Sequence, residues 1–331
     1  MERFALAAAV VLGFALTAAL CSLFVPLRRV LERREQTHQP VQSEQPRPAP
    51  LRAPLWGGLC AAAGTVAAVG VGWLAACVGQ PELLGSEGRL MTRLLTALAG
   101  SLAFGAVGLA EDLARMRSPA ALGLRRDVRL LLEALAAAFV LLLLQAAGCL
   151  PRGLDVPGAG YVLLGSAVPF LWAVLMVALA ECARIAERDE GTVCGAAFVA
   201  MLALMMAEAG LGVPGLAVLP AALAGALVAL LLWAFPPARL GVGCCGSLLA
   251  AGAIGCIPLS LDMTSLTVPL ALPFWAAGGL LAAQLLGAKR TGKPLRCWVK
   301  KHKMSPETVF LCSFALSAVG YVLALALLRW C

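Results

Sequence analysis

Charged residues are scarce in this chain. Asp, Glu, Lys and Arg make up 13% of its 331 residues, whereas 61% are hydrophobic and the mean hydropathy is +0.89. A water-soluble domain needs a much larger share of charged surface. The composition therefore excludes a soluble enzyme and predicts one integral membrane domain over residues 1–331.

Histidine is nearly absent, since the chain has only His38 and His302. Both lie in polar stretches, and neither has a second ligand at a metal-binding spacing, so we interpret them as surface residues. The 12 cysteines include no CxxC pair, and most fall within apolar runs, where a thiol behaves as a small hydrophobic group. Cys149 and Cys331 are predicted on the same side of the membrane, where a disulfide between them is one alternative and two free thiols the other.

Internal repeats and nucleic-acid motifs are also absent. The two halves of the chain are not similar to each other, which argues against a secondary transporter built from inverted repeats. The net charge of +8 would suit a nucleic-acid-binding protein, but the membrane topology accounts for it. We therefore expect membrane lipids, and no nucleic acid, among the partners. The sequence does not decide whether the chain forms a homo-oligomer.

Apolar runs bounded by charge predict about ten transmembrane helices. A helix that crosses a hydrocarbon core of about 30 Å needs roughly 20 apolar residues. Eight predicted spans approach this length: 4–25, 55–78, 94–110, 130–148, 162–179, 216–235, 266–286 and 309–328. Two more are shorter: 193–206, and 248–261, which Pro258 interrupts. The predicted fold is all-α and polytopic.

Positive charge orients these spans. Cytoplasmic loops retain Lys and Arg, and 21 of the 26 such residues fall in the five loops that alternate spans place on one side: 26–54, 111–129, 180–191, 236–247 and 287–308. Both termini are then extracytoplasmic, in a multi-pass protein of the cytoplasmic (plasma) membrane. Residues 28–53 read as a flexible polar linker, and the basic loop 287–308 favours contact with anionic lipid headgroups.

The cytoplasmic segments contain six short motifs in order. They are APLWGG (53–58), FGAVGLAEDLARM (104–116), LGLRRDVRLLLEAL (122–135), ECARIAERDEG (181–191), GCCGSL (243–248) and PLRCWVKKHKMSPETV (294–309). From about residue 50 to the end, this series resembles the polyprenyl-phosphate N-acetylhexosamine-1-phosphate transferases, above all the phospho-N-acetylmuramoyl-pentapeptide transferase branch.

The first three motifs keep the family pattern with conservative changes. The second helix of the family opens P-x-x-G-G, matched here by Pro54, Gly57 and Gly58. Its third helix ends G-x-x-D-D-x-x-K, where this chain has Gly108, Glu111, Asp112 and Arg115. The following G-L-S-x-x-x-K-x-x-x-Q stretch corresponds to Gly123, Leu124, Arg129 and Glu133.

The last three motifs depart further from the family. In N-x-x-N-x-x-D-G-x-D-G, Glu187 and Glu190 stand for the aspartates, Gly191 is kept, and Glu181 and Arg184 replace the two asparagines. In G-D-x-G-S-L, the residues Gly243, Gly246 and Ser247 are kept, but Cys244 occupies the place of the aspartate. The P-L-H-H-H segment keeps its first two residues and loses its histidines to Arg296, Cys297 and Trp298.

The resemblance implies transfer of a sugar phosphate from a UDP-sugar to a polyprenyl phosphate, with release of UMP in the presence of Mg²⁺. Mg²⁺ prefers oxygen ligands, and a thiol is a poor substitute for a carboxylate. Glu111 and Asp112 are therefore the expected catalytic and metal-binding residues. Cys244 stands where the family has a metal-site aspartate.

The residues expected to bind substrate are basic, acidic or small. They are Arg115, Arg129, Glu133, Glu187, Glu190, Gly243, Gly246, Ser247 and Lys300. Each has an alternative interpretation. The carboxylates at 111 and 112 could pair with Arg115 at a hydrated helix end, the basic residues could be ordinary cytoplasmic charge, and the glycines could serve helix packing.

Three functions are compatible with this sequence. The first is an active transferase with a shifted ligand set, acting in cell-envelope glycan synthesis, with phospho-N-acetylmuramoyl-peptide as one candidate group. The second is an inactive family member that binds lipid phosphate or regulates envelope assembly. The third, a transporter or channel, rests only on charges that lie at helix ends.

The predicted orientation is tested by labelling cysteines in intact cells with a membrane-impermeant thiol reagent. The reagent should modify Cys149, which is predicted outside, and should spare Cys297 in the basic loop until the cells are opened. Modification of Cys297 alone in intact cells would reverse the predicted orientation.

Overall fold

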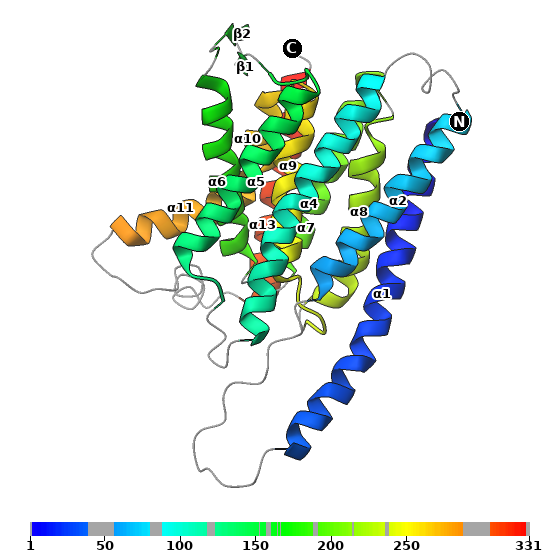
Figure 1. Ribbon diagram of the computed structural model, residues 1–331, viewed down its shortest axis with the longest axis vertical. Helices are drawn as coiled ribbons and strands as arrows, with labels where there is room; N and C mark the ends of the chain where they lie inside the picture. Colours follow the sequence, from blue (N-terminus) through cyan, green and yellow to red (C-terminus); the bar gives the residue numbers. More distant parts are fainter. Residues whose placement is uncertain are drawn as a thin grey trace.

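The computed structural model describes residues 2–38, 56–79, 88–117, 123–151, 153–156, 160–163, 165, 167–187, 191–213, 215–235, 238–286 and 305–328. In these ranges the chain forms a bundle of long helices with a short β-hairpin at one end (Figure 1). The chain is therefore mostly helical, as the apolar runs predict.

Ten helices of 15 residues or more lie in the described ranges. They are α1 (Glu2–His38), α2 (Gly57–Gly79), α4 (Gly88–Arg117), α5 (Arg126–Ala146), α6 (Ala167–Ala186), α7 (Thr192–Gly210), α8 (Val218–Ala234), α9 (Gly243–Ser260), α11 (Leu272–Leu286) and α13 (Pro306–Leu328). Two short elements, η1 (Thr264–Leu266) and α10 (Thr267–Leu270), precede α11. Each predicted span overlaps a helix.

Seven of the described helices are long and apolar enough to cross a membrane. They comprise Phe4–Phe24, Gly57–Val78, Leu90–Arg117, Ala167–Ala186, Thr192–Gly210, Gly243–Ser260 and Glu307–Leu328. A shorter apolar helix, Val218–Ala234, lies among them. The multi-pass architecture follows from these helices, whereas the count of ten spans stays a prediction.

Three local predictions from the sequence are wrong. Residues before Ala167 do not begin α6; instead β1 (Gly153–Val156) and β2 (Gly160–Leu163) form an antiparallel hairpin, in which Gly153 pairs with Leu163. Pro258 does not interrupt α9 but lies within its last turn; its missing N–H leaves one helical hydrogen bond unmade, and the helix ends two residues later. The polar linker does not begin at residue 28, since α1 continues to His38 through good helix formers.

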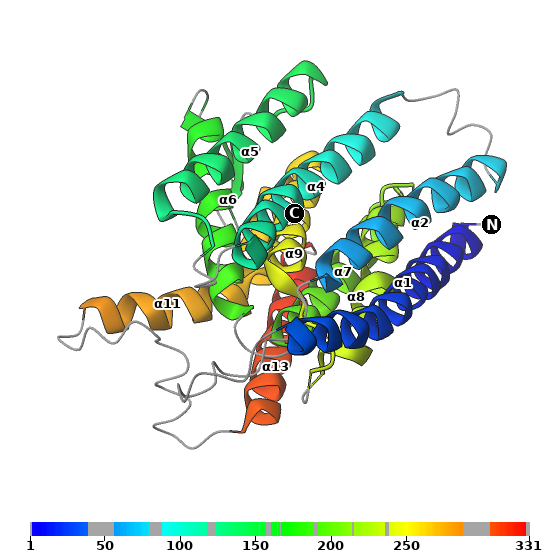
Figure 2. The same cartoon turned by 60° about the horizontal axis from the view of Figure 1, so that its bottom comes forward.

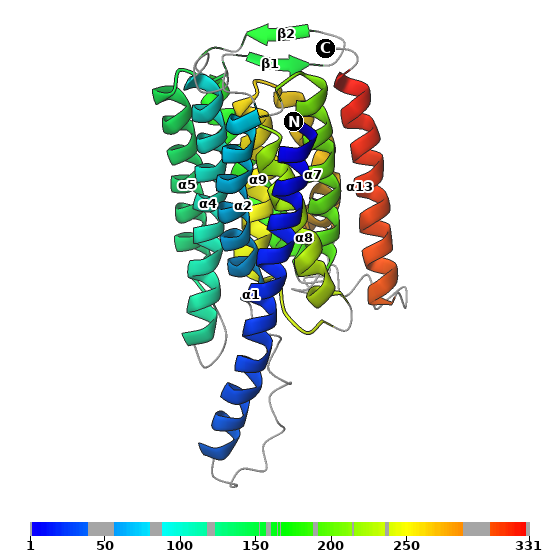
Figure 3. The ribbon, with the colours of Figure 1, turned by 90° about the vertical axis from the view of Figure 1, so that its right-hand side faces the viewer.

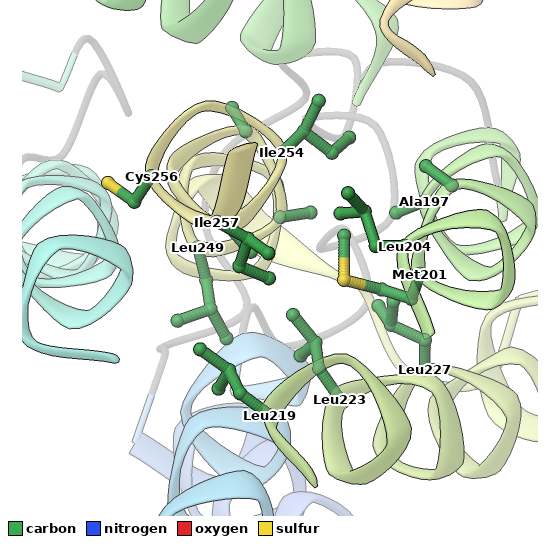
Figure 4. Close-up of a cluster of buried hydrophobic side chains, with 14 of the residues drawn as sticks. Ala197, Met201, Leu204, Leu219, Leu223, Leu227, Leu249, Ile254, Cys256 and Ile257 are labelled. Atoms are coloured by element: carbon green, nitrogen blue, oxygen red, sulfur yellow. The ribbon is translucent and has the colours of Figure 1, made fainter. Parts of the chain in front are cut away.

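Helix α9 is the central element of the bundle. All of its residues are buried, and it packs against α2, α4, α6 and α7. Its sequence is rich in Gly, Ala and Cys on every side, which allows neighbouring backbones to approach closely in an apolar environment. Larger side chains fill the space between α7, α8 and α9, where Met201 meets Leu223 and Ile257 (Figure 4).

The ends of the helices define two ends of the bundle. The hairpin, the start of α1 and the end of α13 lie together at one end (Figure 3). The end of α4 and the starts of α2, α5 and α9 lie at the opposite end. Helix α11 contacts α6 and α13 and extends outward from the other helices (Figures 1 and 2).

Glycines bring α2 against the beginning of α9. The N–H groups of Gly57 and Gly58 donate to the carbonyls of Gly241 and Val242, at 3.2 and 2.9 Å. A Cβ added at Gly58 would lie 2.6 Å from the Cα of Gly246 and would also meet its backbone nitrogen. The two backbones are therefore in contact where α2 and α9 begin.

Gly58→Ala should lower the thermal unfolding temperature in detergent. The new methyl group has no room beside Gly246, and overpacking of this kind costs about 1–3 kcal/mol. Gly70→Ala on the same helix is the matched control. Nothing lies within 4 Å of its added Cβ, and alanine favours the helix. Unfolding is followed with a fluorescent thiol reagent that reacts as buried cysteines become accessible. Equal temperatures for the two variants would contradict this packing.

Candidate functional site

The candidate site is built at the helix ends opposite the hairpin (Figure 3). Helix α4 brings Glu111, Asp112 and Arg115. Helix α5 supplies Arg129 and Glu133, the end of α6 supplies Glu181 and Arg184, and α9 begins with Gly243 and Cys244. Four segments that are distant in the sequence therefore meet in one region.

Asp112 holds the N-terminus of α9. One carboxylate oxygen accepts the N–H of Cys244 at 3.0 Å, and the other accepts the N–H of Cys245 at 2.9 Å. The side chain is buried. The first N–H groups of a helix have no partner within it, and its positive end favours an anion. Hydrogen bonds to a charged group contribute roughly 1.5–3 kcal/mol each, so this contact fixes α9 to α4.

The backbone at the start of α9 requires glycine. Gly243 has a φ of +73°, a left-handed conformation that other residues adopt only with strain. Gly108 on α4 faces this turn, and a Cβ there would lie 2.7 Å from the Cα of Cys245 and would meet the carbonyl oxygen of Cys244. These two glycines let the N–H groups of α9 reach Asp112, one turn further along α4.

Glu111 pairs with two arginines. Its Oε1 accepts a hydrogen bond from Arg115 at 2.6 Å and lies 3.7 Å from the guanidinium of Arg129. Its Oε2 is buried and has no hydrogen-bond partner. The predicted helix-end pair with Arg115 therefore exists. This pairing uses Oε1 and leaves Oε2 of Glu111 without a hydrogen-bond partner.

Arg129 connects three helices. Its Nε donates to Glu181 of α6 at 2.8 Å and lies 3.9 Å from Glu133 of α5. With Glu111 of α4, this guanidinium contacts three carboxylates. Glu181 is held in turn by Arg184, at 2.5 Å.

Carboxyl groups outnumber guanidinium groups in this cluster, among the residues that the structure describes. The ion pairs include four carboxylates (Glu111, Asp112, Glu133 and Glu181) and three guanidinium groups (Arg115, Arg129 and Arg184). Both oxygens of Glu133 are buried without a hydrogen-bond partner. Glu187 adds a fifth carboxylate within electrostatic range of Asp112 and Arg115. Such a site favours a cation, because buried carboxylates are costly without compensation.

The structure brings most of the predicted site residues together. Glu111, Asp112, Arg115, Arg129, Glu133, Glu187, Gly243 and Cys244 belong to this region, whereas Glu190, Lys300 and Cys331 lie outside the described residues. Gly246 packs against Gly58, and Ser247 donates to the carbonyl of Cys244 at 3.1 Å. Those two contacts are structural. The contacts of Gly246 and Ser247 with substrate stay predictions.

Glu181 and Arg184 were not predicted as site residues. The motif marked them only as replacements for two asparagines, yet they join the cluster through Arg129. Opposite charges three residues apart at the end of an apolar helix are the signal that could have identified them, because membrane helices carry charges mainly for function.

The cysteine pair at the start of α9 contributes backbone rather than sulfur to this site. Cys244 and Cys245 donate their N–H groups, and both thiols are buried and free. Among the described residues, no group of three or more His, Cys, Asp or Glu is arranged to hold a metal ion. A protein-only metal cage is therefore not part of the described site.

The chain is similar in sequence to known proteins over the segments that build this site. Residues 94–262, which include the helices that build the site, match the model of "Glycosyl transferase family 4". The chain is similar to the phospho-N-acetylmuramoyl-pentapeptide-transferase of Mycobacterium tuberculosis (strain ATCC 25618 / H37Rv), with 28% identity over 265 residues covering 72% of each protein.

Two further relatives carry the same name. One, from Geobacillus kaustophilus (strain HTA426), is 25% identical over 296 residues, covering 88% of this chain and 86% of the relative. The other, from Synechococcus sp. (strain RCC307), is 30% identical over 212 residues, covering 63% of this chain and 55% of the relative. The family match spans half of the chain and contains all four segments of the charge cluster, and the chain belongs to glycosyl transferase family 4.

Proposed function

We propose that this protein is an active membrane phosphosugar transferase. It would move a phospho-N-acetylhexosamine from a UDP-sugar to a polyprenyl phosphate at the cytoplasmic face, for cell-envelope glycan synthesis. The name of its relatives makes phospho-N-acetylmuramoyl-pentapeptide one candidate group. The observation that carries this proposal is the convergence of acidic and basic side chains from α4, α5 and α6 at the start of α9.

The proposed orientation has ten membrane spans and both termini outside the cytoplasm. Positive charge in the loops supports it, and so does the position of the start of α1 and the end of α13 at the hairpin end of the bundle (Figure 3). The charge cluster then faces the cytoplasm. A water-soluble UDP-sugar and a lipid phosphate can meet there.

The donor set is compatible with Mg²⁺ bound together with substrate. Mg²⁺ commonly uses one or two carboxylates and completes its shell with water and substrate phosphates. The Oε2 of Glu111, which has no hydrogen-bond partner, and the larger number of carboxyl than guanidinium groups in the cluster suit this arrangement. Glu111 and Asp112 would hold the ion, which would neutralise charge on the diphosphate.

The protein residues then have separate roles. Asp112 is oriented by two N–H groups of α9, and Glu111 is oriented by Arg115. Arg115 and Arg129 can exchange a carboxylate for a phosphate oxygen without moving far, since both already face the cluster. In the transfer, an oxygen of the polyprenyl phosphate attacks the phosphorus that carries the sugar, and the bond to UMP breaks. Positioning and charge neutralisation are the main requirements of this chemistry.

The second candidate is an inactive family member. Cys244 is a buried thiol where the family has a carboxylate, and both oxygens of Asp112 are engaged by α9. A pair of charged residues, Glu181 and Arg184, also occupies the place of two amides. Such a protein would bind lipid phosphate as a regulatory partner in envelope assembly.

Asp112→Asn should reduce UMP release by at least about 100-fold, as expected when a group that stabilises transferred charge is lost. The assay uses purified protein in detergent with undecaprenyl phosphate, Mg²⁺ and several UDP-N-acetylhexosamines. Asp127→Asn is the matched control, because that carboxylate is on α5 and its side chain is 83% exposed. The unfolding temperature of each variant separates a catalytic loss from a folding defect. Wild-type turnover in a folded Asp112→Asn protein would contradict the proposed role.

Cys244→Asp separates the two candidates. In an active enzyme the new carboxylate lies beside Asp112 and Glu187, and like-charge repulsion should lower turnover, whereas Cys244→Ser should stay within a few-fold of wild type. Mg²⁺ binding is measured by calorimetry in parallel. If the wild type releases no UMP and Cys244→Asp gains Mg²⁺-dependent turnover, the result would instead support the inactive family member.

A further inference from the structure

Four buried cysteines gather beside the start of α9. Cys21 comes from α1, Cys60 from α2, Cys194 from α7 and Cys245 from α9, and all four are free thiols. The thiols of Cys21 and Cys60 are neighbours that interact with each other. Cys194 lies within electrostatic range of Cys21, and Cys245 within that of Cys60. Thiols that belong to four different helices are therefore close together.

The packing of α1 on α2 explains why Cys21 faces Cys60. The two helices are antiparallel and pack against each other, and the end of α1 extends beyond α2 (Figure 3). A Cβ at Gly72 would lie 2.9 Å from the Cβ of Ala9, and a Cβ at Gly64 would lie 3.1 Å from the backbone nitrogen of Thr17.

These contacts follow a constant register. From Ala9 to Thr17 the chain advances eight residues along α1, and from Gly72 to Gly64 it returns eight along α2. One turn further, the same register pairs Cys21 with Cys60. One turn beyond that, Phe24 stacks on Trp56, with ring centroids 5.6 Å apart. Gly64, one turn from Cys60, lets the two backbones approach closely, as the short Cα separation of a disulfide requires.

We propose that Cys21 and Cys60 are a redox pair that forms a reversible disulfide between α1 and α2. The oxidant is a small peroxide that can enter the membrane. The first thiol breaks the O–O bond, forming a sulfenic acid and one water. The second thiol attacks the sulfenic sulfur, so that the S–S bond forms and a second water leaves. A thiol donor returns both cysteines to the reduced state.

The bond would act on the start of α9. Gly57 and Gly58, a few residues before Cys60, donate backbone hydrogen bonds to Gly241 and Val242, and this segment leads into the turn that Asp112 holds. A link from α2 to α1 would therefore restrain the segment that presents N–H groups to the site. The inference needs only the two thiols and does not depend on transferase activity.

The test treats purified wild-type protein with hydrogen peroxide, removes the peroxide with catalase, and alkylates the denatured protein with N-ethylmaleimide. Intact mass should show a loss of two alkylated sites from the 12 cysteines of the chain. Peptide mapping should identify a bond between Cys21 and Cys60, and dithiothreitol should restore both sites. The oxidised protein should unfold a few degrees higher than the reduced protein, since a cross-link restricts the unfolded chain.

Matched variants make the assignment specific. Cys21→Ser and Cys60→Ser should each abolish the two-site loss and the rise in unfolding temperature, whereas Cys194→Ser should keep both. A bond from Cys60 to Cys245, or from Cys21 to Cys194, would overturn the proposal. The absence of any two-thiol loss in the wild type, even with molecular iodine as oxidant, would overturn it as well.

Discussion

The contact between the Asp112 carboxylate and the first N–H groups of α9 determines the rest of the site. It satisfies two donors that have no partner within the helix, and it compensates a buried charge with the positive end of the same helix. Gly58 and Gly108 serve this contact, because larger residues would hold α2 and α4 away from α9, and Gly243 serves it through its left-handed backbone conformation. Packing and electrostatics therefore depend on the same few atoms.

The charge cluster is organised around Arg129. Removing one partner of a buried ion pair commonly costs 3–5 kcal/mol, because the other charge loses its compensation. Here one guanidinium compensates carboxylates from three helices, and Glu133 is fully buried beside it. The replacement of two family asparagines by Glu181 and Arg184 adds a pair that is neutral in sum, which explains how the site accepts two new charges.

Hydropathy predicted the helices because apolar runs of sufficient length have few alternatives in a membrane. The motif order predicted that the loops near residues 111, 187 and 244 would meet. Two kinds of feature were not predictable. Asp112 is bound by backbone N–H groups, whose partners depend on how α4 and α9 pack and not on side-chain identity. The hairpin at Gly153–Val156 and Gly160–Leu163 is short and lacks a clear alternation of polar and apolar residues, so no strand was predicted and its last two residues, 162 and 163, were assigned to the following helix.

The complete enclosure of α9 has a consequence for biogenesis. Its main neighbours, α2, α4, α6 and α7, all precede it in the chain and leave the ribosome first. A helix rich in glycine, alanine and cysteine is stabilised chiefly by close packing against other helices. These four helices can therefore pack around the future position of α9 before it is synthesised. The carboxylate of Asp112 then lacks its two backbone partners until α9 is inserted and supplies the N–H groups of Cys244 and Cys245.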